Sequence, residues 1–199
     1  MIKTSIIIPS FGSRVEYLHD TIVSAHNQSM PRSEYEIIVV DNSPDGRVKK
    51  IVDKFNAEEQ LSIRYVRETQ AGLHSARHAG AREAAGEILV YVDDDVLTPF
   101  DWLTAITRPF QHQQVGCAGG KNILKFETEP PSWYAHFNGG GLSKLDLGDK
   151  VLELKYPGIW GCNMAVRKNV FYKVGGSNVD SFGDPELIWF SGDGECGLQ

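Results

Sequence analysis

Cysteine, basic residues and long apolar runs are scarce in this sequence of 199 residues. Cys117, Cys162 and Cys196 are odd in number and form no CxxC pair, so reduced thiols in a cytoplasmic-type compartment are the simplest interpretation. A net charge of −6 argues against nucleic-acid binding, which needs a basic surface. No apolar run approaches the roughly 20 residues that span a bilayer, and the first residues show no signal-peptide pattern. We therefore expect a cytoplasmic protein with at most peripheral membrane contact, such as at the inner face of the membrane.

The remaining composition is that of an ordinary globular protein, with 41% hydrophobic and 23% charged residues. A chain of this length can bury a full core and fits one domain. In the first half, short runs of β-branched and aromatic residues alternate with segments that have apolar residues at helical spacing. We predict strands at 5–9, 36–40, 61–66 and 88–92, with helices between and after them. This alternation indicates βαβ units and a mainly parallel sheet with helices on both faces.

Two predicted helices have boundary signals of their own. Ser13 and Glu16 have the spacing of a capping box at the start of the first helix. Gly72 precedes a helix over about residues 74–85, and Gly86 is placed to end it. The inward face of this second helix consists of alanine and glycine, so we expect it to pack closely on the sheet.

Three consecutive carboxylates, Asp93, Asp94 and Asp95, follow the fourth predicted strand directly. Together in a low-dielectric core they would repel one another and raise each other's pKa values. A divalent cation relieves that repulsion, and Mg²⁺ and Mn²⁺ prefer carboxylate oxygen, usually with water and substrate phosphates. Taken alone, the triplet fits a solvated acidic turn equally well.

The position of the triplet in the sheet favours a metal site. In open parallel sheets, ligands bind outside the carboxyl ends of the strands. Those ends here have Pro9-Ser10-Phe11, Asp41 and the three aspartates. These stretches are expected to meet at one edge, where a cation would let an acidic protein hold a diphosphate.

The second half is less regular. We predict strands within 115–124 and 158–167 and a helix at 168–173, while residues 126–156 show little periodicity and are typical of a lid or binding loop. In that segment Trp133-Tyr134 is a candidate for stacking on a sugar, and the glycine run at 139–141 suggests a hinge. Trp102 is expected to be a packing anchor. Trp160 fits an acceptor site and a sheet face equally well.

Together these residues resemble the family-2 glycosyltransferases with the GT-A fold. The resemblance covers nearly the whole chain and rests on seven short motifs in the family's order, each of them weak alone. They are SIIIPSF (5–11), VDNS (40–43), GLHSAR (72–77), VDDD (92–95), GCNMAVR (161–167), VGG (174–176) and GDGE (192–195). The resemblance implies an α/β, Rossmann-like fold with a central, mostly parallel sheet flanked by helices. It also implies a single catalytic domain, with a nucleotide-sugar-binding half at residues 1–99 and a mixed acceptor-binding half at 100–199.

The resemblance also assigns roles on the donor side. Pro9, Ser10 and Phe11 match the residues that hold the nucleotide base, with the Phe11 ring placed for stacking. Asp41 matches the carboxylate that accepts a hydrogen bond from an N–H of the base, and Arg77 matches a position near the diphosphate. The D-x-D motif spans 93–95: Asp95 matches the ligand of Mn²⁺ or Mg²⁺, Asp93 contacts the ribose or the metal, and Asp94 lies between them on the donor side.

The implied reaction moves a sugar from a nucleoside-diphosphate sugar to a hydroxyl of a saccharide or glycolipid-type acceptor, in polysaccharide or glycoconjugate biosynthesis. Asp193 matches the general base, and one base without a second carboxylate nucleophile implies inversion at the anomeric carbon. The residues expected on the acceptor side are Trp160, Asn163 and Glu195.

The sequence departs from the family pattern in two places. Gly192 stands where an acidic residue often precedes the base, and the chain ends at Gln199, before the helix that normally follows, which predicts a shortened acceptor half. Two other functions stay open. One is a non-catalytic subunit that binds a sugar nucleotide. The other is a sugar-phosphate nucleotidyltransferase, although the glycine-rich basic loop of that class is reduced here to one glycine and one arginine in residues 10–14.

Overall fold

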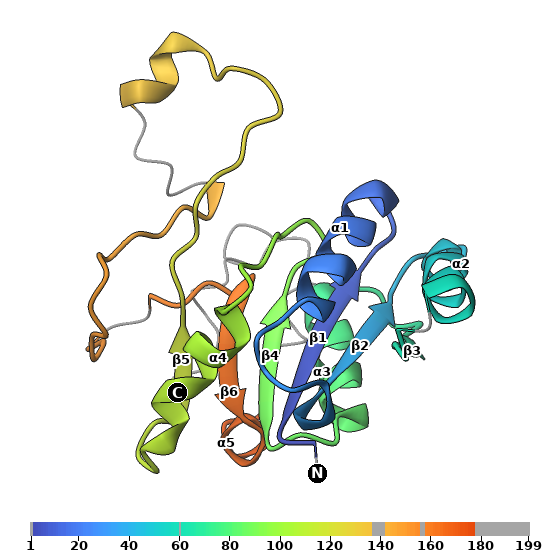
Figure 1. Ribbon diagram of the computed structural model, residues 1–199, viewed down its shortest axis with the longest axis horizontal. Coiled ribbons are helices and arrows are strands. Elements are labelled where there is room, and N and C mark those ends of the chain that lie inside the picture. Colours follow the sequence, from blue (N-terminus) through green and yellow to red (C-terminus); the bar gives the residue numbers. More distant parts are fainter. Residues whose placement is uncertain (1, 60, 137–141, 156–157, 178–199) are drawn as a thin grey trace.

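A six-stranded sheet in the order β3-β2-β1-β4-β6-β5 forms the centre of the structure, a computed structural model that describes residues 2–59, 61–136, 142–155 and 158–177 (Figure 1). The parallel strands are β1 (Thr4–Ser10), β2 (Tyr35–Asp41), β3 (Arg64–Arg67) and β4 (Ile88–Val92). The antiparallel strands are β5 (Cys117–Gly119) and β6 (Asn163–Arg167), of which β6 pairs with both β4 and β5. The predicted α/β architecture with a mostly parallel sheet and a mixed second half is confirmed.

Helices cover both faces of this sheet because the side chains of its strands alternate and are apolar on both sides. Ile6 and Ile8 of β1 pack in one core cluster, while Ile7 packs in the other. The first cluster lies under α1 (Val15–His26), α2 (Arg47–Lys54) and α4 (Trp102–Thr107). The second lies under α3 (Leu73–Glu83) and α5 (Lys168–Lys173). Short helical turns occur at Arg32–Glu34, Phe55–Glu59, Arg108–Gln111 and Ser132–His136.

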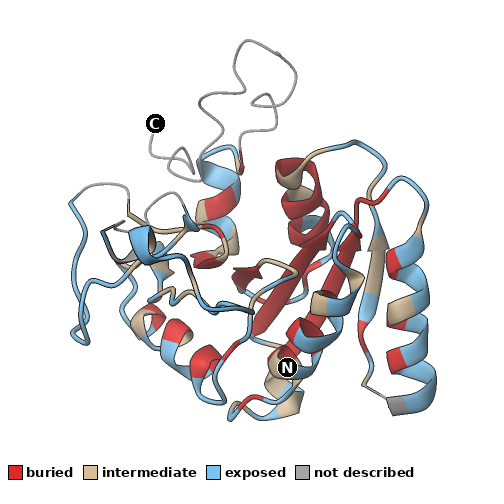
Figure 2. Ribbon diagram, turned by 90° about the horizontal axis from the view of Figure 1, so that it is seen from above, coloured by how far each residue is buried: buried red, intermediate tan, exposed pale blue. Residues whose placement is uncertain are grey.

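The segment between β5 and β6 differs from the rest of the chain. It leaves the body of the protein in Figure 1 and is mostly exposed in Figure 2, whereas buried residues concentrate in the central strands and the helices on them. An isolated bridge between Asn122 and Leu145 holds two parts of it together. The predicted irregular segment is therefore confirmed, and the glycine run at 139–141 lies outside the described residues. Within the described part of the chain, no helix has both the length and the apolar character needed to cross a membrane.

Two predicted helix boundaries are wrong. α1 begins after Arg14, and no side chain caps its first turn, so Ser13 and Glu16 form no capping box. α3 ends at Glu83, and Ala84 is already extended, so Gly86 does not end the helix. A Cβ at Gly86 would lie 2.7 Å from the backbone nitrogen of Ser5, so this glycine allows close approach to β1.

Three predicted strands are shorter than expected. β3 begins only at Arg64, because the side-chain amide of Asn56 donates to the Ile63 carbonyl at 2.8 Å and accepts from the Ile63 N–H at 2.7 Å. These bonds occupy the groups that a longer ladder would need. In the second half, only Cys117–Gly119 of 115–124 and Asn163–Arg167 of 158–167 form strands, whereas the helix at 168–173 is confirmed.

Candidate active site

The candidate site lies at the carboxyl ends of β1, β2 and β4, which we call the carboxyl edge. Because β2 and β4 lie on opposite sides of β1, the strand order reverses there, and such a switch point is where open α/β sheets bind ligands. The Asn42 N–H donates to the Ser10 carbonyl at 2.8 Å, and the Ser10 hydroxyl donates to the Asp94 carboxylate at 2.5 Å. These two bonds join the three strand ends, so the predicted polar stretches do meet at one edge.

The three consecutive aspartates of this edge take three different partners. Asp93 lies 3.7 Å from an Arg77 guanidinium nitrogen, Asp94 accepts from Ser10, and Asp95 pairs with Arg14 at 3.1 Å. Burial, together with the charge of Asp95, raises the pKa of Asp94 despite the bond from Ser10. Each carboxylate of the triplet thus has a polar partner of its own, while repulsion between Asp94 and Asp95 persists.

Asp93 and Asp95 fit a divalent cation by the chemistry of their donor atoms. Their side chains are 32% and 42% exposed, so carboxylate oxygens remain accessible at the edge. Among the described residues, no group of three or more metal-ligating side chains occurs. Mg²⁺ commonly takes only one or two protein carboxylates and completes its shell with water and substrate phosphates. The residues present therefore fit a metal that is bound together with a phosphorylated ligand.

Arg77 occupies a buried position behind Asp93. Arg77 is 0% exposed, and a Cβ on Gly161 would collide with its guanidinium, so the turn before β6 covers the guanidinium. The Tyr91 hydroxyl donates to the Arg77 carbonyl at 3.3 Å. In this arrangement Arg77 orients Asp93, and direct contact with a diphosphate would require the turn at Gly161 to move.

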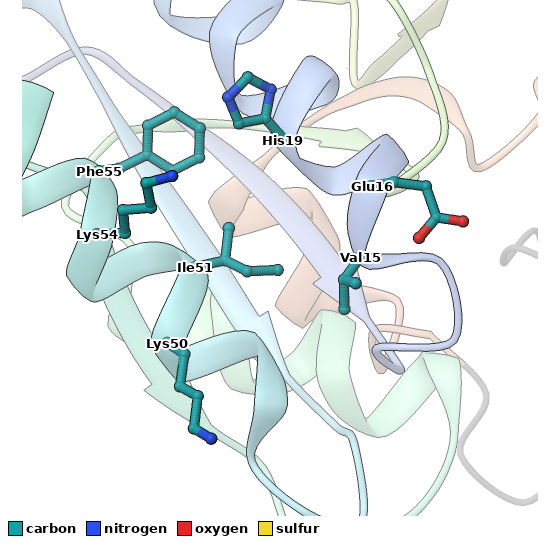
Figure 3. Close-up of a pocket in the computed structure, with 7 residues that line it drawn as sticks. All are labelled: Val15, Glu16, His19, Lys50, Ile51, Lys54 and Phe55. Carbon is teal, nitrogen blue, oxygen red and sulfur yellow. The ribbon is translucent and has the colours of Figure 1, made fainter.

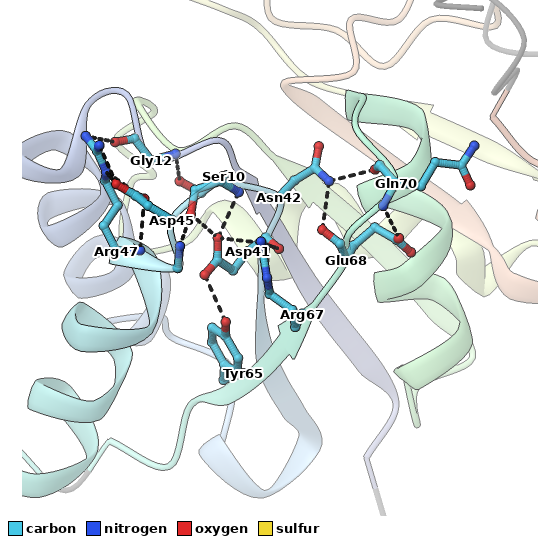
Figure 4. Close-up of polar contacts among 12 residues, drawn as sticks. Ser10, Gly12, Asp41, Asn42, Asp45, Arg47, Tyr65, Arg67, Glu68 and Gln70 are labelled. Carbon is cyan, nitrogen blue, oxygen red and sulfur yellow. Dashed lines mark hydrogen bonds and ion pairs between the residues drawn. The ribbon is translucent and has the colours of Figure 1, made fainter.

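Asp41 is fully buried at the end of β2, where three side chains surround it (Figure 4). Its Oδ1 accepts from the backbone N–H and hydroxyl of Ser43, at 2.8 and 2.6 Å, and from Arg67 at 3.2 Å. Its Oδ2 accepts from the Tyr65 hydroxyl at 2.8 Å. Burial and this bond raise the pKa of Tyr65 to about 12. A base N–H would have to join or replace these donors, so contact between Asp41 and a base stays a prediction.

The loops that follow β1 and β2 are joined to each other. Gly12 has a φ of +74°, which few other residues adopt, and its N–H donates to the Ser10 hydroxyl at 3.2 Å. Arg47 reaches back to the Gly12 carbonyl at 3.5 Å and pairs with Asp45 (Figure 4). The hydrogen bonds from Arg47 lower the pKa of Asp45 to about 2. Pro9 is buried, whereas the ring of Phe11 is 57% exposed and accessible to a base.

Asn42 fixes the loop that leads into α3. Its amide nitrogen donates to the carbonyls of Glu68 and Gln70 at 3.0 and 2.7 Å, and its amide oxygen accepts from the Gly72 N–H at 2.9 Å (Figure 4). This loop immediately precedes the helix that contains Arg77. The end of β2 thus helps to position the buried arginine.

On the acceptor side, the structure describes Trp160 and Asn163. Trp102 is buried, as predicted for a packing anchor, and its indole N–H donates to the Asn163 amide oxygen at 2.9 Å. The Asn163 amide nitrogen donates to the Lys121 carbonyl at 3.1 Å, so this side chain ties α4 to β6 and to the chain after β5. Trp160 is half-buried just before β6. Asp193 and Glu195 lie outside the described residues.

A separate cavity of about 360 Å³ lies between α1 and α2 (Figure 3). It is lined by Val15, Glu16, His19, Lys50, Ile51, Lys54 and Phe55. The lining of this cavity includes none of the residues that the sequence predicts to bind the donor.

Sequence reasoning missed three side chains that contact the predicted carboxylates: Arg14, Tyr65 and Arg67. Arg14 could have been found as a lone cation four residues beyond the end of β1. Tyr65 and Arg67 alternate along β3, and only the register of Asp41 with Arg67 brings them to that carboxylate.

A strand-order reversal with carboxylates beyond the strand ends defines the class of this protein as an open α/β fold with a candidate ligand site at its switch point. The model of the family described as "Glycosyl transferase family 2" matches residues 5–175 of this chain. The chain belongs to this family of enzymes.

Solved structures show the same fold. A mannosyltransferase from Pyrobaculum calidifontis in complex with GDP-Man and Mn²⁺ aligns with a TM-score of 0.64 and 24% identity, over 87% of this chain and 47% of that one. Staphylococcus aureus TarS 1-349 in complex with UDP-GlcNAc aligns with a TM-score of 0.60 and 19% identity, over 86% of this chain and 47% of that one. At these identities the likeness establishes the GT-A fold.

Curated relatives match over shorter stretches. The poly(ribitol-phosphate) beta-N-acetylglucosaminyltransferase TarS of S. aureus is 28% identical over 95 residues, which is 48% of this chain and 16% of that protein. Glycosyltransferase AglE of Haloferax volcanii is 30% identical over 117 residues, which is 58% of this chain and 38% of that protein. The chain thus spans well under half the length of these relatives.

Proposed function

We propose that this chain is the donor-binding and catalytic part of a metal-dependent, inverting glycosyltransferase. It would move a sugar from a nucleoside-diphosphate sugar to a hydroxyl of a saccharide or glycolipid-type acceptor, in polysaccharide or glycoconjugate biosynthesis in the cytoplasm. The observation that supports this most directly is the pair of accessible carboxylates, Asp93 and Asp95, at the switch point of the sheet. The complexes of the two similar structures, with GDP-Man and Mn²⁺ and with UDP-GlcNAc, agree with such a donor.

In the donor half of the site, residues of the carboxyl edge would bind the metal and the diphosphate. Asp95, with Asp93, would hold Mn²⁺ or Mg²⁺, and a bound divalent ion stabilises the negative charge of a departing diphosphate. Arg77 would keep Asp93 in position from behind. Asp94 accepts a hydrogen bond from Ser10, so it would support the site from the strand end and not as a metal ligand.

The base of the nucleotide would lie against Phe11. An exposed aromatic ring beside a strand end offers a stacking surface that any base can use. Asp41 would accept an N–H from the base if the Tyr65 hydroxyl shifts away from its carboxylate. Since Pro9 is buried in β1, it would shape the floor of this subsite and not contact solvent.

The acceptor half, in residues 100–199, would supply the proton acceptor. We propose Asp193 as the general base, which typically contributes about 10²–10⁴-fold to a rate, with Trp160 and Glu195 around the acceptor. Asn163, whose amide is bonded to Trp102 and Lys121, would support this side from behind. Asp193→Asn should abolish transfer while the dissociation constant of the nucleotide stays within about twofold, because a base acts on the acceptor. Loss of nucleotide binding in Asp193→Asn would instead place this residue on the donor side.

The direct test is turnover of a panel of UDP-, GDP- and dTDP-sugars with Mn²⁺ or Mg²⁺, with and without saccharide acceptors. The proposal predicts release of nucleoside diphosphate that needs both metal and acceptor, and NMR of the product should show the opposite anomeric configuration to the donor. Binding of a donor without turnover on any acceptor would favour a non-catalytic subunit. Formation of a sugar nucleotide from a nucleoside triphosphate and a sugar phosphate would favour a nucleotidyltransferase.

A further inference from the structure

Arg14 forms an ion pair with Asp95, the carboxylate that the proposed function assigns to the metal. The Arg14 Nη1 atom lies 3.1 Å from Asp95 Oδ2, and among the residues that the structure describes no other side chain forms an ion pair with Asp95. Both side chains are substantially exposed, at 60% and 42%. An exposed ion pair of this kind contributes little to stability and is screened by solvent. The guanidinium of Arg14 can therefore be replaced at Asp95 by a more strongly bound cation without disturbing the fold.

The loop around Arg14 leaves room for its side chain to move. Arg14 directly precedes α1, with φ −135° and ψ 63°, outside the helix, and no side-chain bond caps the helix start. Its guanidinium carbon also lies 5.9 Å from the centre of the Tyr17 ring, so a second favourable neighbour is within reach. Moving the guanidinium from the carboxylate towards the ring or the loop would need no change in the helix.

We propose that Arg14 is an exchangeable counter-ion of the donor site. In the free protein it neutralises Asp95 and competes with the divalent cation; when the metal arrives with a nucleoside diphosphate, the guanidinium leaves Asp95 and contacts the diphosphate. The exchange requires that both cations use the same carboxylate and that phosphate oxygens then lie beside it. This inference rests on the proposed function, because the anion that receives Arg14 is the donor's diphosphate.

This exchange predicts effects of opposite sign on two binding equilibria. In Arg14→Gln, Mn²⁺ alone should bind about two- to fivefold more tightly, the size of an exposed ion pair. The same variant should bind UDP or GDP in the presence of Mn²⁺ about tenfold more weakly, because a charge-assisted hydrogen bond to phosphate is lost. Arg14→Lys should restore most of both values, since the positive charge remains.

The experiment is a titration of the whole chain with Mn²⁺, with free ion counted by electron paramagnetic resonance, followed by calorimetric titration with UDP and GDP. Lys3→Gln is the matched control: the Lys3 side chain is similarly exposed, at 66%, but pairs with Glu34 at the amino end of the sheet, so its removal should leave Mn²⁺ affinity unchanged. Equal tightening in Lys3→Gln would mean that only the general loss of positive charge matters, and would overturn the proposal.

Two further outcomes are informative. If the wild-type chain binds UDP or GDP with Mn²⁺ but Arg14→Gln changes both equilibria in the same direction, or neither, the counter-ion role is wrong and the proposed function stands. If the wild-type chain binds no nucleotide in the presence of Mn²⁺, the proposed function fails, and the role of Arg14 fails with it.

Discussion

The two ends of the central sheet use carboxylates in opposite ways. At the amino end, Glu36 of β2 accepts from the Ser5 hydroxyl at 2.7 Å, from the Ala85 N–H at 2.6 Å and from Arg64 at 2.8 Å. At the carboxyl edge, the side chains of Asp93 and Asp95 are 32% and 42% exposed and lie beside the guanidinium groups of Arg77 and Arg14. The comparison separates a carboxylate that stabilises the fold from carboxylates that are kept accessible for a ligand.

Asp41 lies between these two extremes. It belongs to the carboxyl edge, yet it is buried even more deeply than Glu36 and is surrounded by donors from Ser43, Tyr65 and Arg67. Position at a strand end is therefore insufficient to make a carboxylate available. What distinguishes Asp93 and Asp95 is that their side chains, which follow β4, stay partly exposed beside separate partners.

The largest expected effect follows from Asp95→Asn. Loss of the carboxylate proposed to hold the metal should weaken Mn²⁺-dependent binding of UDP or GDP at least about 100-fold, since Asp93 would be the one carboxylate left of the proposed pair. Calorimetric titration measures this. The melting temperature should stay within about 1 °C, because exposed ion pairs contribute little. Asp53→Asn, which removes an exposed carboxylate paired with Lys49, is the control and should leave nucleotide affinity unchanged. Equal affinity in wild type and Asp95→Asn would remove this residue from the site.

Glu36→Gln should show the opposite pattern, with lower stability and unchanged nucleotide affinity. Placing an amide NH₂ against Arg64 or the Ala85 N–H leaves donors facing donors, which costs about 1–3 kcal/mol of unfolding free energy. Glu83→Gln is the control, because Glu83 pairs with the same Arg64 in an exposed position. Chemical denaturation of both variants would measure the difference, and equal losses would show that burial at Glu36 does not matter.

The cost of Glu36→Gln should also depend on pH. Burial raises the pKa of Glu36, but the bonds from Arg64, Ser5 and the Ala85 N–H outweigh this effect and lower it below the ordinary value of 4.5. A lowered folded-state pKa stabilises the protein above the unfolded-state pKa, and that contribution is lost as the pH falls through the folded-state value. The difference between wild type and variant should therefore be full at pH 7 and shrink below about pH 4.5. A difference that grows in acid would contradict this assignment.

Phe11→Ala is expected to have the smallest effect of the three. Base–aromatic stacking is worth about 1–3 kcal/mol per base, so nucleotide affinity should fall by about tenfold with stability unchanged. Phe100→Ala is a close control, because Phe100 is equally exposed, at 61% against 57%. A similar loss of affinity in both variants would mean that exposed apolar area, and not stacking at the carboxyl edge, explains the result.

The sequence predicted the sheet and the meeting of the polar strand ends at one edge because both depend on local patterns. Runs of β-branched residues define β1, β2 and β4, and the polar residues that follow them reach one edge by topology alone. The errors arise where distant side chains decide the outcome. The side chain of Asn56 keeps Ile63 out of strand β3, which begins at the next residue. Gly86 is needed for close contact with β1 and does not end a helix.

The same reason limits what could be predicted within the site. The resemblance implies that Asp41 contacts the base and that Arg77 lies near the diphosphate. No local signal shows that Tyr65 and Arg67 surround Asp41 or that Gly161 covers Arg77. These contacts join segments that lie from 24 to 84 residues apart. Their effect is to place both side chains behind the surface that a ligand would meet.

The most direct test of the central claim is a calorimetric titration of the wild-type chain with UDP and GDP, in Mn²⁺ and in EDTA. The carboxyl edge as described predicts that Mn²⁺ strengthens binding of at least one nucleotide tenfold or more, by roughly 1.4 kcal/mol at the least. Equal affinity for both nucleotides in Mn²⁺ and in EDTA would contradict the claim that Asp93 and Asp95 hold a cation that binds the diphosphate.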